Sequence, residues 1–366
     1  MPDASIRGEL PPERDIEVEL REQVAAAHAA GTTLAIAGGG TKAFYGRSLE
    51  TAATLDVTPH QGVVAYEPTE LAITVRAGTP LAAVEALLDA NGQQLPFEPP
   101  HFGAAATVGG AVAAGLSGPR RPYAASVRDA VLGVRMLNGR GQVLDFGGRV
   151  MKNVAGYDVS RLMAGSLGVL GVLLEVSLKV MPKPVGKLTL LREEPLERAL
   201  GLMRQWAGRS LNLTATAWAD GHLYARLCGS DEALAEGRGA IGGEPLAARG
   251  FWTNLREQRL AAFDGPEPLW RVSVAPASGP LTLAERQVVE WGGGLRWFKA
   301  DLDPVETRAA AQAAGGHATL FRAGGGTARG DVFTPLGEVS ARLHRRLKQA
   351  FDPAGILNPG RMYPEL

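Results

Sequence analysis

The chain contains 366 residues, 45% of them hydrophobic and 21% charged, and this balance excludes a disordered or collagen-like protein. Glycine is unusually abundant, with 47 residues, and 24 prolines accompany it. The 38 lysine and arginine residues balance 38 aspartate and glutamate residues. A formal net charge of zero disfavours a protein that binds nucleic acid or an anionic membrane through excess basic charge.

The first half of the chain alternates helix and strand signals. Asp15 is placed to cap a helix that ends at Gly31, and Thr79-Pro80 opens a second helix that closes at Asn91-Gly92. The expected strands lie at 34–37, at 63–66 with 72–77, at 131–137 with 142–146, and at 173–180. The segment Met181-Pro-Lys-Pro184 then indicates a boundary.

Beyond Pro184 the pattern indicates a second α+β region. Asp220-Gly221 separates two alternating segments, 214–218 and 222–227, and predicts a hairpin. The other expected elements are helices at 196–206, 283–291, 304–314 (capped by Asp303 and Glu306) and from Thr334-Pro335 onward, and strands at 271–274, 295–299 and 319–322. Residues 229–250 are expected to form loop and short helix. Two α+β domains fit this length.

The single cysteine, Cys228, excludes an internal disulfide, an iron–sulfur cluster and a cysteine-rich zinc site within this chain. It favours a reducing compartment. The first 13 residues lack the apolar stretch of a secretory signal, and the longest uncharged run, 99–119, is too rich in glycine and alanine for a good membrane span. We expect a cytoplasmic protein with no transmembrane segment, associated with the inner membrane, if at all, through its partners.

Three glycine-rich segments, 37–42, 102–118 and 165–171, favour a large nucleotide cofactor. Glycine lets several backbone N–H groups approach one diphosphate closely. A P-loop is excluded because the only Gly-Lys pair, Gly186-Lys187, precedes leucine. Gly38, Gly40 and Ala43 satisfy a dinucleotide fingerprint, but residues 44–53 lack the apolar stripe of a crossover helix, which disfavours a Rossmann unit.

Five motifs follow one another in a characteristic order. They are Ala37-Gly-Gly-Gly-Thr-Lys42, Thr107-Val-Gly-Gly110 with Ala113-Ala-Gly115, Val127-Arg-Asp129, Lys152-Asn-Val-Ala-Gly-Tyr-Asp158 and Gly165-Ser-Leu-Gly-Val-Leu-Gly171. This series resembles the FAD-binding domain of the vanillyl-alcohol oxidase (PCMH-type) superfamily. The end of the chain, Phe351-Asp-Pro-Ala-Gly-Ile-Leu-Asn-Pro-Gly360, is similar to the C-terminal segment of its 2-hydroxy-acid branch. Phe97-Glu-Pro-Pro-His-Phe-Gly103 and Gly118-Pro-Arg-Arg-Pro122 resemble the FAD-binding E subunits of bacterial glycolate oxidases.

The resemblance implies an α+β fold with a PCMH-type two-part FAD-binding domain at 1–184. It also implies a smaller α+β substrate or partner domain at 185–330 and a segment at 331–366 that returns to the FAD domain. Its first loop would wrap the FAD diphosphate, and Asn358 would bring the C-terminal tail toward the flavin. The residues that the resemblance assigns to FAD are Gly38, Gly39, Gly40, Thr41, Lys42, His101, Gly103, Thr107, Gly109, Gly110, Ala114, Gly115, Ser117, Gly168, Gly171, Val172 and Asn358.

Departures from the family pattern refine this expectation. Thr41 stands where relatives with covalent flavin carry histidine, so we predict noncovalent FAD. Leu167 replaces the acid that is common in the last loop, and the paired-histidine motif of the catalytic relatives is missing. His317 and Arg322 are weak candidates for a base and a carboxylate-binding cation, and structural roles are favoured for both. No clustered ligands indicate a metal site.

The function that the resemblance implies is that of the FAD-binding subunit of a glycolate oxidase (2-hydroxy-acid dehydrogenase) complex. Its partners would be a catalytic flavoprotein subunit and an iron–sulfur subunit, and its substrate class would be small 2-hydroxy acids. Two alternatives stay open: a self-sufficient FAD-dependent D-2-hydroxy-acid dehydrogenase, and a non-catalytic scaffold subunit that FAD stabilises.

Overall fold

The computed structural model describes residue 9 and residues 11–148, 158–248, 250–325 and 330–366, which form two compact units. The first unit runs to Ser117 and also includes Ala125–Lys183 and Pro335–Leu366. The second unit consists of Pro184–Thr334 and the short segment Gly118–Ala124. This short segment therefore packs with the second unit, although its sequence lies within the first.

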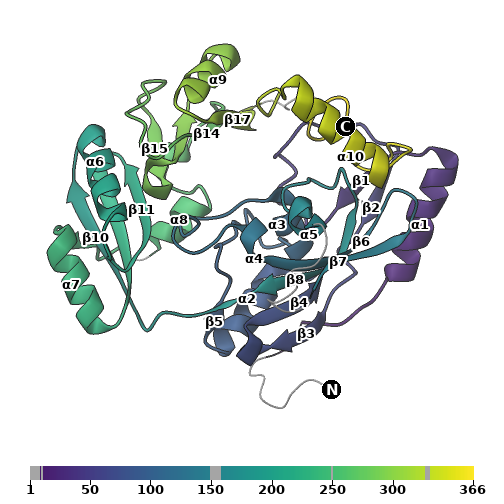
Figure 1. Cartoon of the computed structure of the whole chain (residues 1–366), viewed down its shortest axis with the longest axis horizontal. Coiled ribbons are helices and arrows are strands. Elements are labelled where there is room, and N and C mark those ends of the chain that lie inside the picture. Colours follow the sequence, from purple (N-terminus) through teal and green to yellow (C-terminus); the bar gives the residue numbers. More distant parts are fainter. Residues whose placement is uncertain (1–8, 10, 149–157, 249, 326–329) are drawn as a thin grey trace. The chain divides into compact units, whose positions relative to one another are not determined.

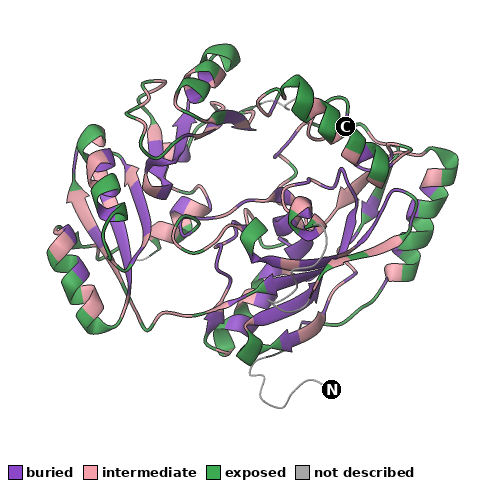
Figure 2. Cartoon of the chain, viewed as in Figure 1, coloured by how far each residue is buried: buried purple, intermediate pink, exposed green. Residues whose placement is uncertain are grey.

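A five-stranded antiparallel sheet forms the centre of the first unit (Figure 1). In spatial order its strands are β3 (Val63–Glu67), β4 (Ala72–Arg76), β8 (Val172–Lys179), β6 (Val131–Leu137) and β7 (Val143–Gly147). Every residue of β4 and nearly every residue of β8 is buried, as Figure 2 shows. Such continuous burial is expected of central strands that are covered on both faces.

Two smaller strand pairs complete the sheets of this unit. β1 (Leu34–Ala37) pairs in parallel with β2 (Ala53–Asp56), and β5 (Gln93–Gln94) pairs with β9 (Met181–Pro182). Parallel neighbours are usually joined through a helix, but residues 38–52 form turns and no α-helix. This glycine-containing connection emerges directly from the end of β1, and it forms part of the pocket described below.

Helices cover the sheets of the first unit. They are α1 (Glu17–Ala30), α2 (Leu81–Ala90), α3 (Val108–Ala114), α4 (Val127–Ala130), α5 (Val159–Met163) and α10 (Glu338–Phe351), with a 3₁₀ turn, η1 (Pro68–Glu70). In α1 the buried residues are Leu20, Val24 and Ala27, whose spacing places them on one helical face. Together with α2, α3 and the buried strands they form one hydrophobic core.

An eight-stranded antiparallel sheet forms the second unit. In spatial order its strands are β13 (Glu244–Pro245), β10 (Gly186–Glu193), β12 (His222–Gly229), β11 (Leu213–Ala219), β15 (Gln287–Glu290), β16 (Leu295–Lys299), β14 (Leu269–Ser273) and β17 (His317–Arg322). Its helices are α6 (Leu196–Ala207), α7 (Asp231–Ile241), α8 (Phe251–Arg256) and α9 (Pro304–Ala313), with 3₁₀ turns η2 (Ala261–Phe263) and η3 (Trp291–Gly293). Helix α6 packs in one core cluster and α9 in another.

Most of the predicted elements are confirmed, including the hairpin of β11 and β12 around Asp220-Gly221 and the helix α9 capped by Asp303. The helix predicted at 283–291 is wrong, because residues 287–290 form β15 between β11 and β16. Residues 229–250, expected to be mainly loop, contain the 11-residue helix α7. The final helix begins at Glu338, and its N-cap is Gly337.

Other differences are local. Thr79 does not cap α2, since its hydroxyl donates to the carbonyl oxygens of Gly62 and Arg76. In the motif that ends at Asp158, residues 152–157 lie outside the described residues, while Asp158 itself caps α5 through the amide of Arg161. No helix in the described ranges is both long and apolar enough to cross a bilayer.

A buried histidine, His60, is expected to make the stability of the first unit depend on pH. His60 is 1% exposed, and its Nδ1 accepts a hydrogen bond from the amide of Ile16 at 3.2 Å. Burial lowers the pKa of His60 below its ordinary 6.5, although Asp15 nearby opposes the shift. Below that ordinary value the unfolded chain binds a proton that the folded chain resists, so His60 lowers stability as pH falls.

We therefore expect the wild-type chain to lose more unfolding free energy than His60→Gln when pH falls from about 7.5 to about 5.5. Glutamine keeps an acceptor for the Ile16 amide but has no titratable proton. Urea titrations followed by circular dichroism at both pH values measure the difference. Parallel losses in the two proteins would contradict the assignment to His60.

Candidate functional site

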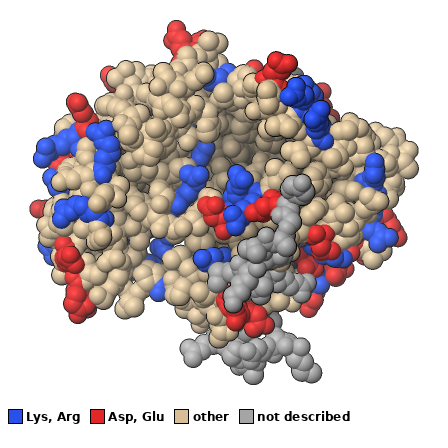
Figure 3. Space-filling view, viewed as in Figure 1, with Lys and Arg blue, Asp and Glu red and all other residues tan. Residues whose placement is uncertain are grey.

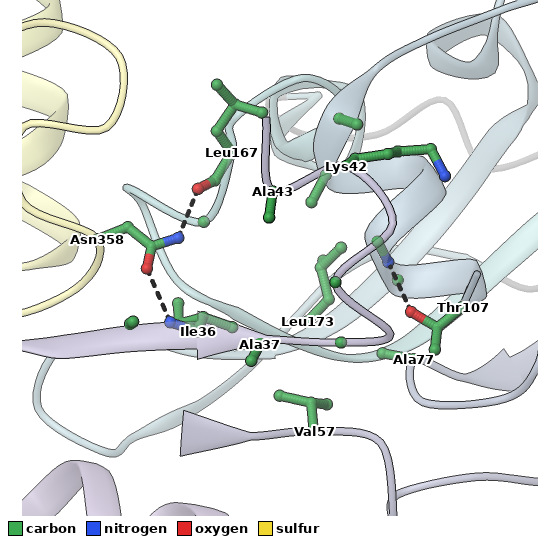
Figure 4. A pocket seen from close by; sticks show the side chains of 18 of the residues that line it. Ile36, Ala37, Lys42, Ala43, Val57, Ala77, Thr107, Leu167, Leu173 and Asn358 are labelled. Atoms are coloured by element: carbon green, nitrogen blue, oxygen red, sulfur yellow. Dashed lines mark hydrogen bonds between the residues drawn. The ribbon is translucent and has the colours of Figure 1, made fainter. Parts of the chain in front are cut away.

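A pocket of about 310 Å³ opens at the end of β1 in the first unit, a size typical of small-molecule sites. Four stretches of chain that are far apart in sequence line it: the segment after β1, the start of α3, the loop before β8, and the C-terminal tail. Figure 4 shows Lys42, Thr107, Leu167 and Asn358 around this pocket. Its lining consists mainly of glycine, alanine and aliphatic residues.

The first wall is a run of backbone donors. Residues 38–41 follow β1, and their N–H groups donate no hydrogen bond within the described part of the chain. Side chains are excluded here by close packing, because a Cβ on Gly39 would overlap the carbonyl oxygen of Ala105, and one on Gly38 would lie 2.6 Å from the Thr107 hydroxyl. Free backbone donors beside two positions that admit only glycine, Gly38 and Gly39, suit an anionic ligand such as a diphosphate.

The second wall comes from the start of α3. Thr107 is the N-cap of this helix, and its hydroxyl accepts the amide of Gly110 at 3.2 Å. A Cβ on Gly109 would lie 2.6 Å from the Cβ of Ala77 on the chain that follows β4. Thr107 and Gly109 thus hold α3 close to both the first wall and the central sheet.

The third wall joins the loop before β8 to the C-terminal tail. Asn358 is 5% exposed, its Oδ1 accepts the amide of Ile36 at 2.8 Å, and its Nδ2 donates to the carbonyl of Leu167 at 2.7 Å (Figure 4). One side chain therefore ties the tail to β1 and to the loop. A Cβ on Gly168 would lie 2.5 Å from that same Nδ2, so the loop needs glycine there.

The structure brings many of the predicted site residues to this pocket. Those that line it are Gly38, Gly39, Gly40, Thr41, Lys42, Thr107, Gly109, Gly110, Ala114, Gly168, Gly171 and Asn358. The other five predicted residues do not line it. Gly103 lies in a bend, Gly115 is the C-cap of α3, and Val172 is fully buried in β8. The ring of His101 binds Glu85 at 2.9 Å, and the hydroxyl of Ser117 accepts the amide of Val127.

Several lining residues were not predicted. Leu49, Thr54, Val57 and Leu173 reach the pocket through the pairing of β1 with β2 and through β8, which no local motif announces. Arg361 also lines it. Its sequence position offered a signal, because Arg361 is a cation directly after Asn358-Pro-Gly360, in the segment that is expected to return to the flavin.

The weak catalytic candidates lie on β17 in the second unit, and neither lines the pocket. Partial desolvation, together with the charge of Arg271, lowers the pKa of His317, although the residue is exposed at the start of β17. Arg322 donates through Nε to the side-chain oxygen of Gln258 at 2.9 Å, and burial lowers its pKa to about 10. Within the described residues no group of three or more His, Cys, Asp or Glu side chains is placed to hold a metal ion.

Comparisons with known proteins agree with this geometry. Residues 16–147 match the family described as FAD binding domain, and residues 329–362 match the C-terminal domain of FAD linked oxidases. Over 97% of its length the chain is 48% identical to glycolate oxidase subunit GlcE of Escherichia coli (strain K12), of which it covers 99%. It is also 32% identical to glycolate oxidase subunit GlcD of Bacillus subtilis (strain 168), over 35% of this chain and 27% of that protein.

The fold is also known among solved structures. The chain superposes on p-cresol methylhydroxylase with substrate bound, with a TM-score of 0.71 and 16% identity over 95% of this chain and 87% of that one. The predicted PCMH-type α+β fold and FAD as the cofactor are thereby confirmed. The residues of the pocket fit that cofactor, because they offer backbone donors for its phosphates and an apolar lining for its ring.

The mode of FAD attachment gives a direct test. Thr41, at the end of the first wall, offers no imidazole nitrogen for a covalent flavin bond, and its hydroxyl lies within 3.4 Å of Lys42 Nζ. We expect acid precipitation of the flavin-loaded chain to release all the FAD into the supernatant, where absorbance measures it. Flavin that stays in the precipitate and resists washing would contradict noncovalent binding.

Proposed function

The chain belongs to the family of the glycolate oxidase subunit GlcE, and from this premise we propose that it is the FAD-carrying subunit of a glycolate-oxidising complex. The observation that carries the proposal is the pocket in which residues 38–41 present unbonded backbone N–H groups to an anion. When bound, FAD supplies a two-electron acceptor for the oxidation of a CH–OH group. The complex that contains such a subunit acts as an oxidoreductase on 2-hydroxy acids, and the FAD of this chain carries electrons within it.

The chain's own residues bind and orient the cofactor in this proposal. The first wall holds the diphosphate through backbone donors, and Asn358 fixes the tail and the loop that contains Leu167 against β1. The mainly apolar lining excludes water from the ring. Lys42 contributes a positive charge at the rim, where its ammonium donates to the carbonyl of His101 at 3.2 Å.

Electrons leave this chain for partner subunits. A single cysteine cannot ligate an iron–sulfur cluster, so we assign the cluster to a separate subunit. The paired histidines of the catalytic relatives are missing from this sequence, which supports placing substrate oxidation on a catalytic flavoprotein partner. The second unit would then serve as the partner-binding domain.

Reconstitution of the complex tests the proposal. We expect glycolate to reduce the flavin of this chain only after the partner subunits are added, as followed by bleaching of its visible absorption without oxygen. Reduction of the isolated chain by glycolate or D-lactate would instead establish a self-sufficient D-2-hydroxy-acid dehydrogenase. Full activity of a complex assembled with a flavin-free chain would establish the scaffold alternative.

A further inference from the structure

Two cations are the only charged residues among those that line the pocket in the described part of the chain. They are Lys42, from the segment after β1, and Arg361, from the C-terminal tail. Charges of both signs are interspersed over the molecular face in Figure 3. A pocket with two positive and no negative lining residues is therefore a local feature of a chain whose formal net charge is zero.

The guanidinium of Arg361 is fixed by backbone carbonyls. Its Nη1 donates to the carbonyl of Arg47, and its Nη2 donates to those of Ala43 and Tyr45, each at 2.7 Å. Three bonds to backbone carbonyls hold the charged group beside residues 43–47, the segment that follows the first wall. A preorganised cation loses little side-chain entropy when it binds an anion.

No acidic side chain in the described ranges neutralises the charge of Arg361. All three acceptors are neutral carbonyls, and no carboxylate forms an ion pair with Arg361 within the described residues. Burial lowers the pKa of its guanidinium, which nevertheless stays protonated at neutral pH. A partly buried cation without a carboxylate is stabilised when an anion binds beside it.

We propose that Arg361 is a diphosphate-binding residue, whose fixed charge complements the backbone donors of residues 38–41. The inference rests on the proposed FAD site, and it assigns to the tail an electrostatic role beyond closing the pocket. The three bonds to carbonyls use only part of the five N–H donors of the guanidinium. The same side chain can thus hold the 43–47 segment and still donate to a phosphate oxygen.

Arg47 provides a matched control. Its Nε donates to the carbonyl of Gly360 at 3.1 Å, and its amide donates to the carbonyl of Arg361 at 2.9 Å. Arg47→Gln weakens contacts between the same two segments, but Arg47 does not line the pocket. Arg361→Lys is the conservative variant, because it keeps the charge and loses the planar fork.

The experiment measures dissociation constants for FAD and for ADP, which carries the diphosphate without the flavin, on the flavin-depleted full-length chain over a range of salt concentrations. Relative to wild type, we expect Arg361→Gln to weaken both ligands at least about tenfold at low salt and to flatten the salt dependence. Arg47→Gln should keep the wild-type salt dependence, and Arg361→Lys should restore most of it. Thermal unfolding of the flavin-free proteins checks that each variant is folded.

Equal losses of affinity and equal salt dependences in Arg361→Gln and Arg47→Gln would overturn the proposal, since Arg361 would then only hold the 43–47 segment. A loss for FAD with no loss for ADP would also overturn it, because the charge would act on the flavin portion. A wild-type chain that binds neither ligand would refute the proposed FAD site itself, so the two failures are distinguishable.

Discussion

Gly39→Ala is expected to abolish FAD binding while the second unit stays folded. The new Cβ would overlap the carbonyl oxygen of Ala105, and a backbone atom cannot rotate away as a flexible side chain can. The 38–41 segment or the loop at Ala105 must move, and the unbonded N–H groups of the proposed diphosphate site are then displaced. We expect FAD affinity to fall at least about a hundredfold, the effect of losing two or more charge-assisted hydrogen bonds.

Titration of the flavin-depleted variant with FAD measures the loss. Gly201→Ala is the matched control, because a Cβ at this position in α6 meets no atom within 4 Å. Alanine in a helix interior should stabilise that variant by about 0.5–1 kcal/mol and leave FAD binding unchanged. Wild-type affinity in Gly39→Ala would mean that the first wall is not part of the flavin site.

Breaking the buried ion pair of α10 is expected to give the largest loss of stability. Lys348 and Asp352 are 6% and 1% exposed, and they meet at 2.8 Å. The ammonium also donates to the carbonyls of Val169 and Leu357, each next to a residue that lines the pocket. Asp352→Asn leaves the ammonium buried without its counter-ion, which costs about 3–5 kcal/mol.

The unfolding of the two units can be followed by separate signals. All six tryptophans lie in the second unit, so their fluorescence reports on that unit alone, while flavin release reports on the first. We expect Asp352→Asn to lower the urea midpoint of flavin release and to leave the tryptophan transition in place. Arg161→Gln, which removes an exposed pair with Asp158, should change stability by less than about 1 kcal/mol. A flavin-release midpoint that does not move in Asp352→Asn would contradict the role of the pair.

Local signals predicted most of the elements, since caps, turns and apolar periodicity act over a few residues. Asp220-Gly221 placed a hairpin correctly, and Asp303 placed the start of α9, where its side chain accepts two amides. The failure at 283–291 has a long-range cause. Val288 and Val289 are buried between β11 and β16, and β11 lies about 70 residues earlier in the sequence.

The candidate site also contains residues that local sequence signals predict and residues that only long-range contacts bring into place. Glycine-rich segments show in the sequence because close backbone approach demands glycine itself, as at Gly39. Val57 and Leu173 reach the pocket only through strand pairing. In the sequence they cannot be distinguished from apolar residues of similar size that lie in the core. Asn358 was found through a motif, but its two bonds, to Ile36 and Leu167, join positions more than 190 residues away from it. No local pattern encodes such a tie.

The most direct test of the account is an FAD titration of the full-length, flavin-depleted chain. Visible absorption and the heat of binding, measured by calorimetry, both report the FAD that is taken up. We predict saturation at a single FAD per chain, with the structured absorption bands of a flavin held in an apolar pocket, and release of the intact cofactor on denaturation. A chain that stays colourless and gives no heat of binding with FAD would contradict the central claim that its backbone donors at 38–41 form a flavin nucleotide site.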